Sequence, residues 1–258
     1  MGQLDGRRAV VTGGGRGIGR AACELLAAEG ASVVVAARSE DEIAAVAASI
    51  VAAGGVAHPM VVDVADDDAV ASLAATAPDL LGGPVDVLVN NAAAYLMNPF
   101  MDYSLDDWSW MLDVNVLGVV RVTRAFLPAM LELDDTRIVN VASIAGKKAT
   151  LWQSAYNTTK HALIGITRCL AVEMGAAGVR VNSVCPGFID TGLVSTERMA
   201  ELNQMPIEEV WPAINNGTAL KRTATVEEVA AAITYLASPL AAGVTGQSLV
   251  VDGGMHYS

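Results

Sequence analysis

The sequence predicts an α/β fold, in which a single doubly wound parallel sheet is flanked by helices. Three observations lead to this prediction. Short β-branched runs alternate with Ala-rich segments of helical length through most of the chain. The apolar runs are continuous, as in parallel strands whose two faces are both covered by helices. A glycine-rich turn separates the first run from the first helix, and 258 residues suffice for one large α/β domain.

The N-terminal part of the chain gives the clearest alternation. The glycine pair 54–55 stops the second helix, because glycine readily adopts the backbone conformation in which helices end. The expected elements are strands over 9–12, 32–36, 56–62 and 85–89, with helices over 17–29, 40–53 and 66–81 between them.

The C-terminal part keeps the pattern, with one long interruption. Long helices are expected over 105–131 and 154–176, strands over 137–142, 179–184 and 247–251, and a helix over 226–237. The stretch from Gly187 to about Thr223 is expected to be irregular. Such folds place substrate loops after the carboxyl end of a strand, so we expect residues 188–216 to form a mobile lid. The alternative is a rigid helix packed on the core. No linker interrupts the pattern, and we expect residues 1–258 to form a single dinucleotide-binding domain.

The composition disfavours several classes of function. With 16 Lys and Arg against 28 Asp and Glu, the net charge is −12. This charge disfavours binding to nucleic acid or to an anionic membrane, because both require cationic patches. The three cysteines and three histidines show no metal-binding spacing, so no metal site is expected. The N-terminus has no apolar secretory segment, and we expect a cytoplasmic protein.

A glycine-rich turn follows the first predicted strand. It reads Thr-Gly-Gly-Gly-Arg-Gly-Ile-Gly over residues 12–19. Glycines there let the backbone turn tightly and approach a pyrophosphate, which then lies at the N-terminus of the next helix. An ordinary connection between strand and helix is the alternative, but the position of the turn before the first helix favours a dinucleotide site.

Tyr156 and Lys160 form a second pattern. They lie four residues apart in an expected helix, so their side chains share one face. A neighbouring ammonium lowers the pKa of a tyrosine, which makes proton exchange with an alcohol or carbonyl feasible. A surface Tyr and Lys at helical spacing is the alternative. Ser143 ends a predicted strand, where a hydroxyl either faces the ligand crevice or caps a turn. Asn90 and Asn91 end another strand, where asparagine side chains can hold the backbone of a turn.

Together these motifs resemble those of the short-chain dehydrogenase/reductase family, in the family's order and over nearly the whole chain. Residues 90–93 resemble its Asn-Asn-Ala-Gly motif, with Ala93 in place of glycine. The resemblance implies a Rossmann-like fold and an oxidoreductase acting on CH–OH groups, similar to carbonyl reductases and to 3-oxoacyl and polyketide ketoreductases. It also implies the following coenzyme-binding residues: Gly13, Gly15, Arg16, Gly17, Ile18, Gly19, Arg38, Asp63, Val64, Asn91, Ala92, Tyr156, Lys160, Pro186, Gly187, Ile189 and Thr191.

The resemblance further implies catalytic roles for Asn115, Ser143, Tyr156 and Lys160. Ser143 would donate a hydrogen bond to the substrate oxygen. Tyr156 would give its proton during reduction or take it during oxidation. Lys160 would lower the pKa of Tyr156 and hold the nicotinamide ribose, and Asn115 would bind a water that connects Lys160 to solvent. The hydride itself belongs to the coenzyme.

The end of the second predicted strand bears on the choice of coenzyme. An NAD site usually needs an acidic residue there to hold both ribose hydroxyls, and none occurs before Glu40. Arg38 is placed to bind a 2′-phosphate, and Arg16 could supply a second positive charge. These residues favour NADP(H) over NAD(H). If Arg38 is a solvated turn residue instead, an NAD-dependent alcohol dehydrogenase of the same family is expected.

Three classes of function remain: a ketone reductase or alcohol dehydrogenase, a family member specialised for dehydration or epimerisation, and a nucleotide-binding regulator without catalysis. The complete set of four catalytic residues favours the first class over the third. The expected pocket is mostly apolar and has no Arg or Lys to bind a carboxylate, which favours an apolar, cyclic or acyl-chain ketone. Its candidate residues are Ala94, Tyr95, Ile144, Trp152, Gln153, Phe188 and the loop that holds Trp211. The two long helices carry apolar surface that in this family packs between subunits, so a homotetramer is expected.

Overall fold

Seven parallel strands form one sheet in the computed structural model, which describes residues 2–256, in the order β3-β2-β1-β4-β5-β6-β7. The strands are β1 (Arg8–Thr12), β2 (Ser32–Ala37), β3 (Val56–Val61), β4 (Val87–Asn90), β5 (Thr136–Val141), β6 (Val179–Pro186) and β7 (Ser248–Val251). The chain winds outward from β1 toward one edge and from β4 toward the other. The doubly wound parallel sheet predicted from the sequence is therefore confirmed.

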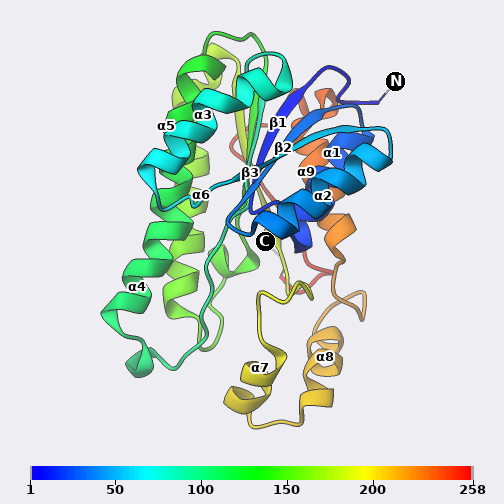
Figure 1. Ribbon diagram of the computed structural model, residues 1–258. Coiled ribbons are helices and arrows are strands. Elements are labelled where there is room, and N and C mark those ends of the chain that lie inside the picture. Colours follow the sequence, from blue (N-terminus) through cyan, green and yellow to red (C-terminus); the bar gives the residue numbers. More distant parts are fainter. Residues whose placement is uncertain (1, 257–258) are drawn as a thin grey trace.

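Helices cover both faces of this sheet (Figure 1). They are α1 (Gly17–Ala28), α2 (Glu40–Ala52), α3 (Asp67–Leu81), α4 (Leu105–Leu112), α5 (Gly118–Met130), α6 (Ser154–Met174), α7 (Thr196–Asn203), α8 (Ile207–Asn216) and α9 (Val226–Ala237). Short 3-10 turns are η1 (Phe100–Asp102), η3 (Ile144–Gly146), η4 (Gly175–Ala177) and η5 (Pro239–Ala241), and η2 (Asp113–Leu117) is π-helical. α9 begins with a capping box, in which the side chains of Thr225 and Glu228 bind each other's backbone N–H groups.

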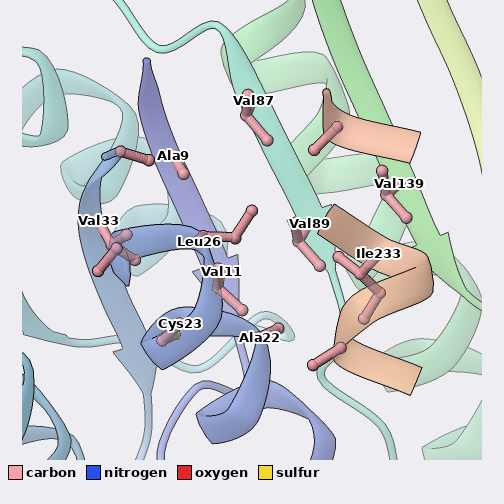
Figure 2. Packing of buried hydrophobic residues seen from close by; sticks show 14 of the residues in the cluster. Ala9, Val11, Ala22, Cys23, Leu26, Val33, Val87, Val89, Val139 and Ile233 are labelled. Atoms are coloured by element: carbon pink, nitrogen blue, oxygen red, sulfur yellow. The ribbon is translucent and has the colours of Figure 1, made fainter. Parts of the chain in front are cut away.

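Alternate residues of the inner strands enter two apolar layers. Val11 of β1 packs in the layer formed with α1, α2 and α9, whereas Val10 packs in the layer formed with α3, α5 and α6. Figure 2 shows the first layer, where Leu26 of α1 and Ile233 of α9 lie against the sheet. All four side chains are 0% exposed, and each such burial contributes about 1.5–3 kcal/mol. Burial on both faces explains why the strands read as continuous apolar runs.

Two segments differ from the prediction. The helix expected over 105–131 is divided, because η2 inserts a π-helical turn between α4 and α5. The region 187–223, expected to be irregular, contains α7 and α8, which Figure 1 shows below the sheet and apart from the helices on its faces. The expectation of an irregular chain there is therefore wrong, because the polar, short sequence of α7 and the internal Pro212 of α8 hide the helical pattern.

The reversal of strand order between β1 and β4 places a crevice at the carboxyl ends of these two strands. Over residues 2–256, no helix is both long enough and apolar enough to cross a membrane. The same residues contain no cluster of three or more His, Cys, Asp or Glu side chains suited to a metal ion.

Candidate active site

The turn after β1 brings three segments of backbone into close approach. Gly13 has φ of +66°, and a Cβ atom there would lie 2.9 Å from the Cα atom of Ala92. A Cβ atom on Gly19 would lie 2.1 Å from the carbonyl oxygen of Gly13. These contacts leave no room for a side chain, so the glycines are required by geometry. The first residues of α1, Gly17 and Ile18, line the cleft that this turn borders.

Asn91 and Thr12 hold the turn against the end of β4. The Asn91 side-chain amide donates to the carbonyl oxygens of Thr12 and Gly13, each at 3.0 Å. The Thr12 hydroxyl accepts from the backbone N–H groups of Asn91, at 3.0 Å, and Ala92, at 3.2 Å. The sequence indicated the backbone-binding role of asparagine here, but not the part of Thr12.

A cleft with an empty volume of about 1350 Å³ follows the carboxyl ends of β1, β2, β3 and β4. Most of the predicted coenzyme-binding residues line it, namely Gly13, Gly15, Arg16, Gly17, Ile18, Gly19, Arg38, Asp63, Val64, Asn91, Ala92 and Thr191. The others line an adjoining pocket of about 690 Å³: Tyr156, Lys160, Pro186, Gly187 and Ile189. The two cavities share five lining residues and therefore lie side by side: Ile18, Asn91, Ala93, Thr191 and Leu193.

One corner of the cleft carries charges of both signs. Arg38 follows β2, and its Nη1 atom lies 3.8 Å from Oδ2 of Asp63, which follows β3. Their side chains are 70% and 42% exposed, so the ion pair adds little stability and leaves the guanidinium accessible. Arg16, Ser39 and Glu42 border the same cleft.

Ser143, Tyr156 and Lys160 meet in the adjoining pocket. Ser143 follows β5, and its hydroxyl accepts from the backbone N–H of Ala145 at 3.1 Å, which leaves its own hydrogen free to donate. Tyr156 and Lys160 lie on the first two turns of α6. The Lys160 ammonium donates to the carbonyl oxygen of Val141 at 2.9 Å and lies 5.5 Å from the centroid of the Tyr156 ring.

Burial dominates the electrostatics of this group. It lowers the pKa of Lys160 to about 8 and raises the pKa of Tyr156, while the hydrogen bond with Ser143 lowers the pKa of Tyr156 by a smaller amount. The sequence led us to expect that Lys160 would depress the pKa of Tyr156. In this structure burial outweighs any such effect, so the phenol is protonated at neutral pH. A protonated phenol can donate to a nascent alkoxide.

Asn115 lies in the π-helical turn η2 and is 1% exposed. Its carboxamide oxygen accepts from the N–H of Ala94 at 2.6 Å, and its amide nitrogen donates to the Ala94 carbonyl at 2.9 Å. The amide nitrogen also donates to the Thr159 hydroxyl at 3.1 Å, and that hydroxyl donates to the carbonyl oxygen of Tyr156 at 2.8 Å. The side chain therefore ties the segment after β4 to α6, and it lines neither cavity.

A buried polar network lies beneath these residues. The Asn90 amide donates to Oδ1 of Asn140 at 2.9 Å and to the hydroxyl of Thr123 at 3.2 Å. The Asn140 amide donates to the Thr167 hydroxyl at 2.9 Å. The network joins β4 and β5 to α5 and α6, and so fixes where the carboxyl ends of these strands meet the helices. Asparagine within two apolar strands was the only sequence signal for it.

The pocket around Ser143 and Tyr156 is largely apolar. Tyr95, Ile144, Gln153 and Phe188 line it as predicted, and the rings of Tyr95 and Tyr156 meet edge to face at 4.9 Å. Of the other expected lining residues, Ala94 borders the larger cleft, and Trp152 and Trp211 line neither cavity. Trp211 instead donates from its indole nitrogen to the Thr196 hydroxyl at 3.2 Å, which turns the indole toward α7.

α7 and α8 follow the segment that lines this pocket, and they pack against the chain after β4. Met199 and Val210 of these helices are buried in an apolar cluster with Met97. Arg198 fastens α7 to the segment after β4, because its Nη2 donates to Oδ1 of Asn98 at 2.6 Å and its Nε donates to the carbonyl of Met97 at 3.2 Å. The sequence predicted that apolar residues of 188–216 would cover the site, but nothing in it identified Arg198 as the residue that binds the segment after β4.

The chain is similar to acyl-carrier-protein and polyketide reductases along nearly its whole length. A family model described as Enoyl-(Acyl carrier protein) reductase matches residues 13–256. A 3-oxoacyl-(acyl-carrier-protein) reductase of Synechocystis sp. is 40% identical over 257 residues, which cover 99% of both chains. A ketoacyl reductase of the monensin polyketide synthase from Streptomyces virginiae is 37% identical over 259 residues, again 99% of both. A crystal structure of a variant actinorhodin polyketide ketoreductase with NADPH has a TM-score of 0.94 and 34% identity, and each chain covers 99% of the other.

Proposed function

The chain belongs to the short-chain dehydrogenase/reductase family and is an oxidoreductase of the ketoreductase type, and on this premise we propose that it interconverts a ketone and a secondary alcohol with NADP(H). The observation that carries the proposal is the meeting of Ser143, Tyr156 and Lys160 in the pocket that adjoins the long cleft. An NAD-dependent alcohol dehydrogenase and an inactive nucleotide-binding regulator are the alternatives that the experiments below address.

The long cleft fits a dinucleotide. Close-packed glycines bring the backbone within reach of a pyrophosphate, and the first residues of α1 face it. Arg38 and Arg16 would hold the 2′-phosphate of NADP(H), Asp63 and Val64 the adenine, and Lys160 the nicotinamide ribose. The preference for NADP(H) is supported by the absence of an acid directly after β2. When bound, the coenzyme supplies or accepts the hydride.

The residues of this chain orient the carbonyl and move its proton. Ser143 donates a hydrogen bond to the substrate oxygen, where negative charge develops. Tyr156 is protonated near neutral pH, and burial raises its pKa further. It gives its proton to that oxygen during reduction and takes it back during oxidation. The Lys160 ammonium stabilises the phenolate that remains. Asn115 keeps the segment after β4 against α6, and a water bound beside it connects Lys160 to solvent.

The substrate we propose is an apolar, cyclic or acyl-chain ketone. The pocket is lined by Tyr95, Ile144, Phe188 and Val194, and neither Arg nor Lys other than Lys160 lines it among the described residues. A small hydroxy acid would find no cation free to bind its carboxylate. The relatives named as 3-oxoacyl and polyketide reductases support the acyl-chain reading.

Three further proposals concern the architecture. The chain forms one domain, in which residues 188–216, including α7 and α8, act as a lid over coenzyme and substrate. The chain assembles as a homotetramer. Exposed apolar side chains on the two long helical segments support this, with Leu105 84% exposed on α4 and Val172 85% exposed on α6. Light scattering at micromolar concentration that detects only monomer would exclude the tetramer.

Tyr156→Phe tests the proposed chemistry. It removes the one hydroxyl that moves the proton and leaves the ring in its edge-to-face contact with Tyr95. We expect kcat for NADPH-dependent reduction of a cyclic ketone to fall by about 10²–10⁴-fold, while the Kd for NADPH stays nearly unchanged. Retention of more than a few per cent of the wild-type kcat would show that Tyr156 is not the acid. Coenzyme binding by the wild type without turnover of any ketone would favour the inactive regulator.

A further inference from the structure

Glu42 borders the coenzyme cleft, although its sequence context gives it no such role. It lies in the first turn of α2, after Glu40 and Asp41. Acidic residues at this end of a helix are explained by the helix dipole. Of these three acids, only Glu42 lines the cleft. Its side chain turns back over the glycine-rich turn, because a Cβ atom placed on Gly15 would lie 3.0 Å from both Cβ and Oε2 of Glu42.

This position puts a carboxylate in the corner proposed to hold the 2′-phosphate. Arg16, Arg38 and Glu42 all line this cleft, and Glu42 lies over Gly15, the residue before Arg16. Oδ2 of Asp63 lies 3.8 Å from Nη1 of Arg38. Two cations therefore face two carboxylates, and the formal charge of the corner sums to zero. Within residues 2–256, Glu42 makes no ion pair within 4.0 Å that would neutralise it.

We infer that Glu42 weakens binding of the 2′-phosphate and so limits the preference for NADP(H) that Arg38 establishes. The inference deepens the proposed function and rests on it. A phosphate monoester carries up to two negative charges near neutral pH, and a carboxylate in the same corner repels it. NAD(H) has a neutral 2′-hydroxyl in place of this phosphate, so the carboxylate does not repel it. The affinities of the chain for NADPH and NADH therefore differ less than we would expect from the absence of an acidic residue directly after β2.

The repulsion has a modest size. A carboxylate and a phosphate dianion about 6 Å apart in water repel by an amount equal to about a tenfold change in affinity, before screening by salt. Screening at physiological ionic strength reduces this effect. We therefore expect about threefold to tenfold tighter binding of NADPH when the charge of Glu42 is removed.

Glu42→Gln tests the inference, because it removes the charge and keeps the shape of the side chain. The dissociation constants of NADPH and NADH would be measured by titration calorimetry with the full chain, at low and at high salt, so that the readout does not depend on turnover. The expected result is about threefold to tenfold tighter NADPH binding and an NADH affinity that changes by less than about twofold. The gain for NADPH should shrink as salt rises.

Glu40→Gln is the matched control. It removes the same charge from the same helical turn, but Glu40 does not line the cleft. An equal gain from both variants would mean that net charge alone acts, and would overturn the inference. An unchanged ratio of NADPH to NADH affinity in Glu42→Gln would overturn it as well. Failure of the wild type to bind either coenzyme would instead remove the proposed function, and the inference with it.

Discussion

Asn115→Ala should destabilise the fold severely, because the Asn115 side chain joins two segments of the site. Its carboxamide makes hydrogen bonds of 2.6 and 2.9 Å with the backbone of Ala94 and one of 3.1 Å with the hydroxyl of Thr159. Alanine makes none of these. The partners are themselves buried, since Ala94 is 5% and Thr159 is 0% exposed.

The size of the effect follows from the groups left unpaired. Each buried polar group that loses its partner costs about 1–3 kcal/mol. In Asn115→Ala, the N–H and the carbonyl of Ala94 and the hydroxyl of Thr159 each lose one hydrogen-bond partner. The Thr159 hydroxyl keeps its hydrogen bond to the carbonyl of Tyr156. Water that enters the vacated space recovers part of the loss. We expect the free energy of unfolding to fall by about 3–5 kcal/mol, and the Tm by roughly 6–20 °C.

Urea unfolding at a fixed protein concentration measures this difference. Asn216→Ala is the matched control: it is the same substitution at an exposed position, the last residue of α8, and should change the free energy of unfolding by no more than about 0.5 kcal/mol. Asn115→Ala with wild-type stability would refute the reasoning, because the bridge between Ala94 and α6 would then carry no energy.

Three further outcomes are expected. Arg38→Asp should weaken NADPH binding about tenfold and improve NADH binding, as measured by their Kd values; the exposure of Arg38 places the effect near the lower end of the range for charge-assisted bonds. Burial lowers the pKa of Lys160 to about 8, so its ammonium loses a proton above that pH. We therefore expect kcat/KM for NADPH-dependent reduction to fall about tenfold per pH unit above pH 8. The guanidinium of Lys160→Arg stays charged, so the same fall of kcat/KM in that variant would show that another group titrates. Arg198→Ala removes both contacts to the segment after β4 and should speed proteolysis within residues 188–216 about tenfold. In the wild type, NADPH and a substrate analogue should slow proteolysis of the same residues. Equal rates of proteolysis with and without these ligands would exclude a mobile lid.

The sequence predicted the sheet well because the strands between its two edges are buried on both faces. A run such as 32–37 has only apolar or small side chains, and no competing helical period. The positions of Ser143 and of the glycine-rich turn could also be predicted, because each comes directly after a continuous apolar strand. Parallel strands bring their carboxyl ends to one edge of the sheet, and residues far apart in the sequence then meet there.

The sequence did not predict contacts that depend on the direction of a single side chain, because the hydrophobic period of a helix or strand does not determine that direction. Nothing in the run Glu40-Asp41-Glu42 distinguishes the acid that turns toward Gly15 from the two that do not. The π-helical turn around Asn115 was hidden because the apolar pattern of 105–131 continues through it. Arg198 was missed because a lone arginine in a polar helix resembles a solvated side chain.

The geometry separates two kinds of residue within the predicted catalytic set. Asn115 and Lys160 bind backbone carbonyls of other segments, at Ala94 and Val141, and therefore help to build the site as well as to serve it. Ser143 and Tyr156 present hydroxyls to the pocket. Loss of activity on changing Asn115 or Lys160 therefore mixes lost geometry with lost chemistry. Tyr156→Phe, which removes only the hydroxyl that moves the proton, reports the proton transfer by itself.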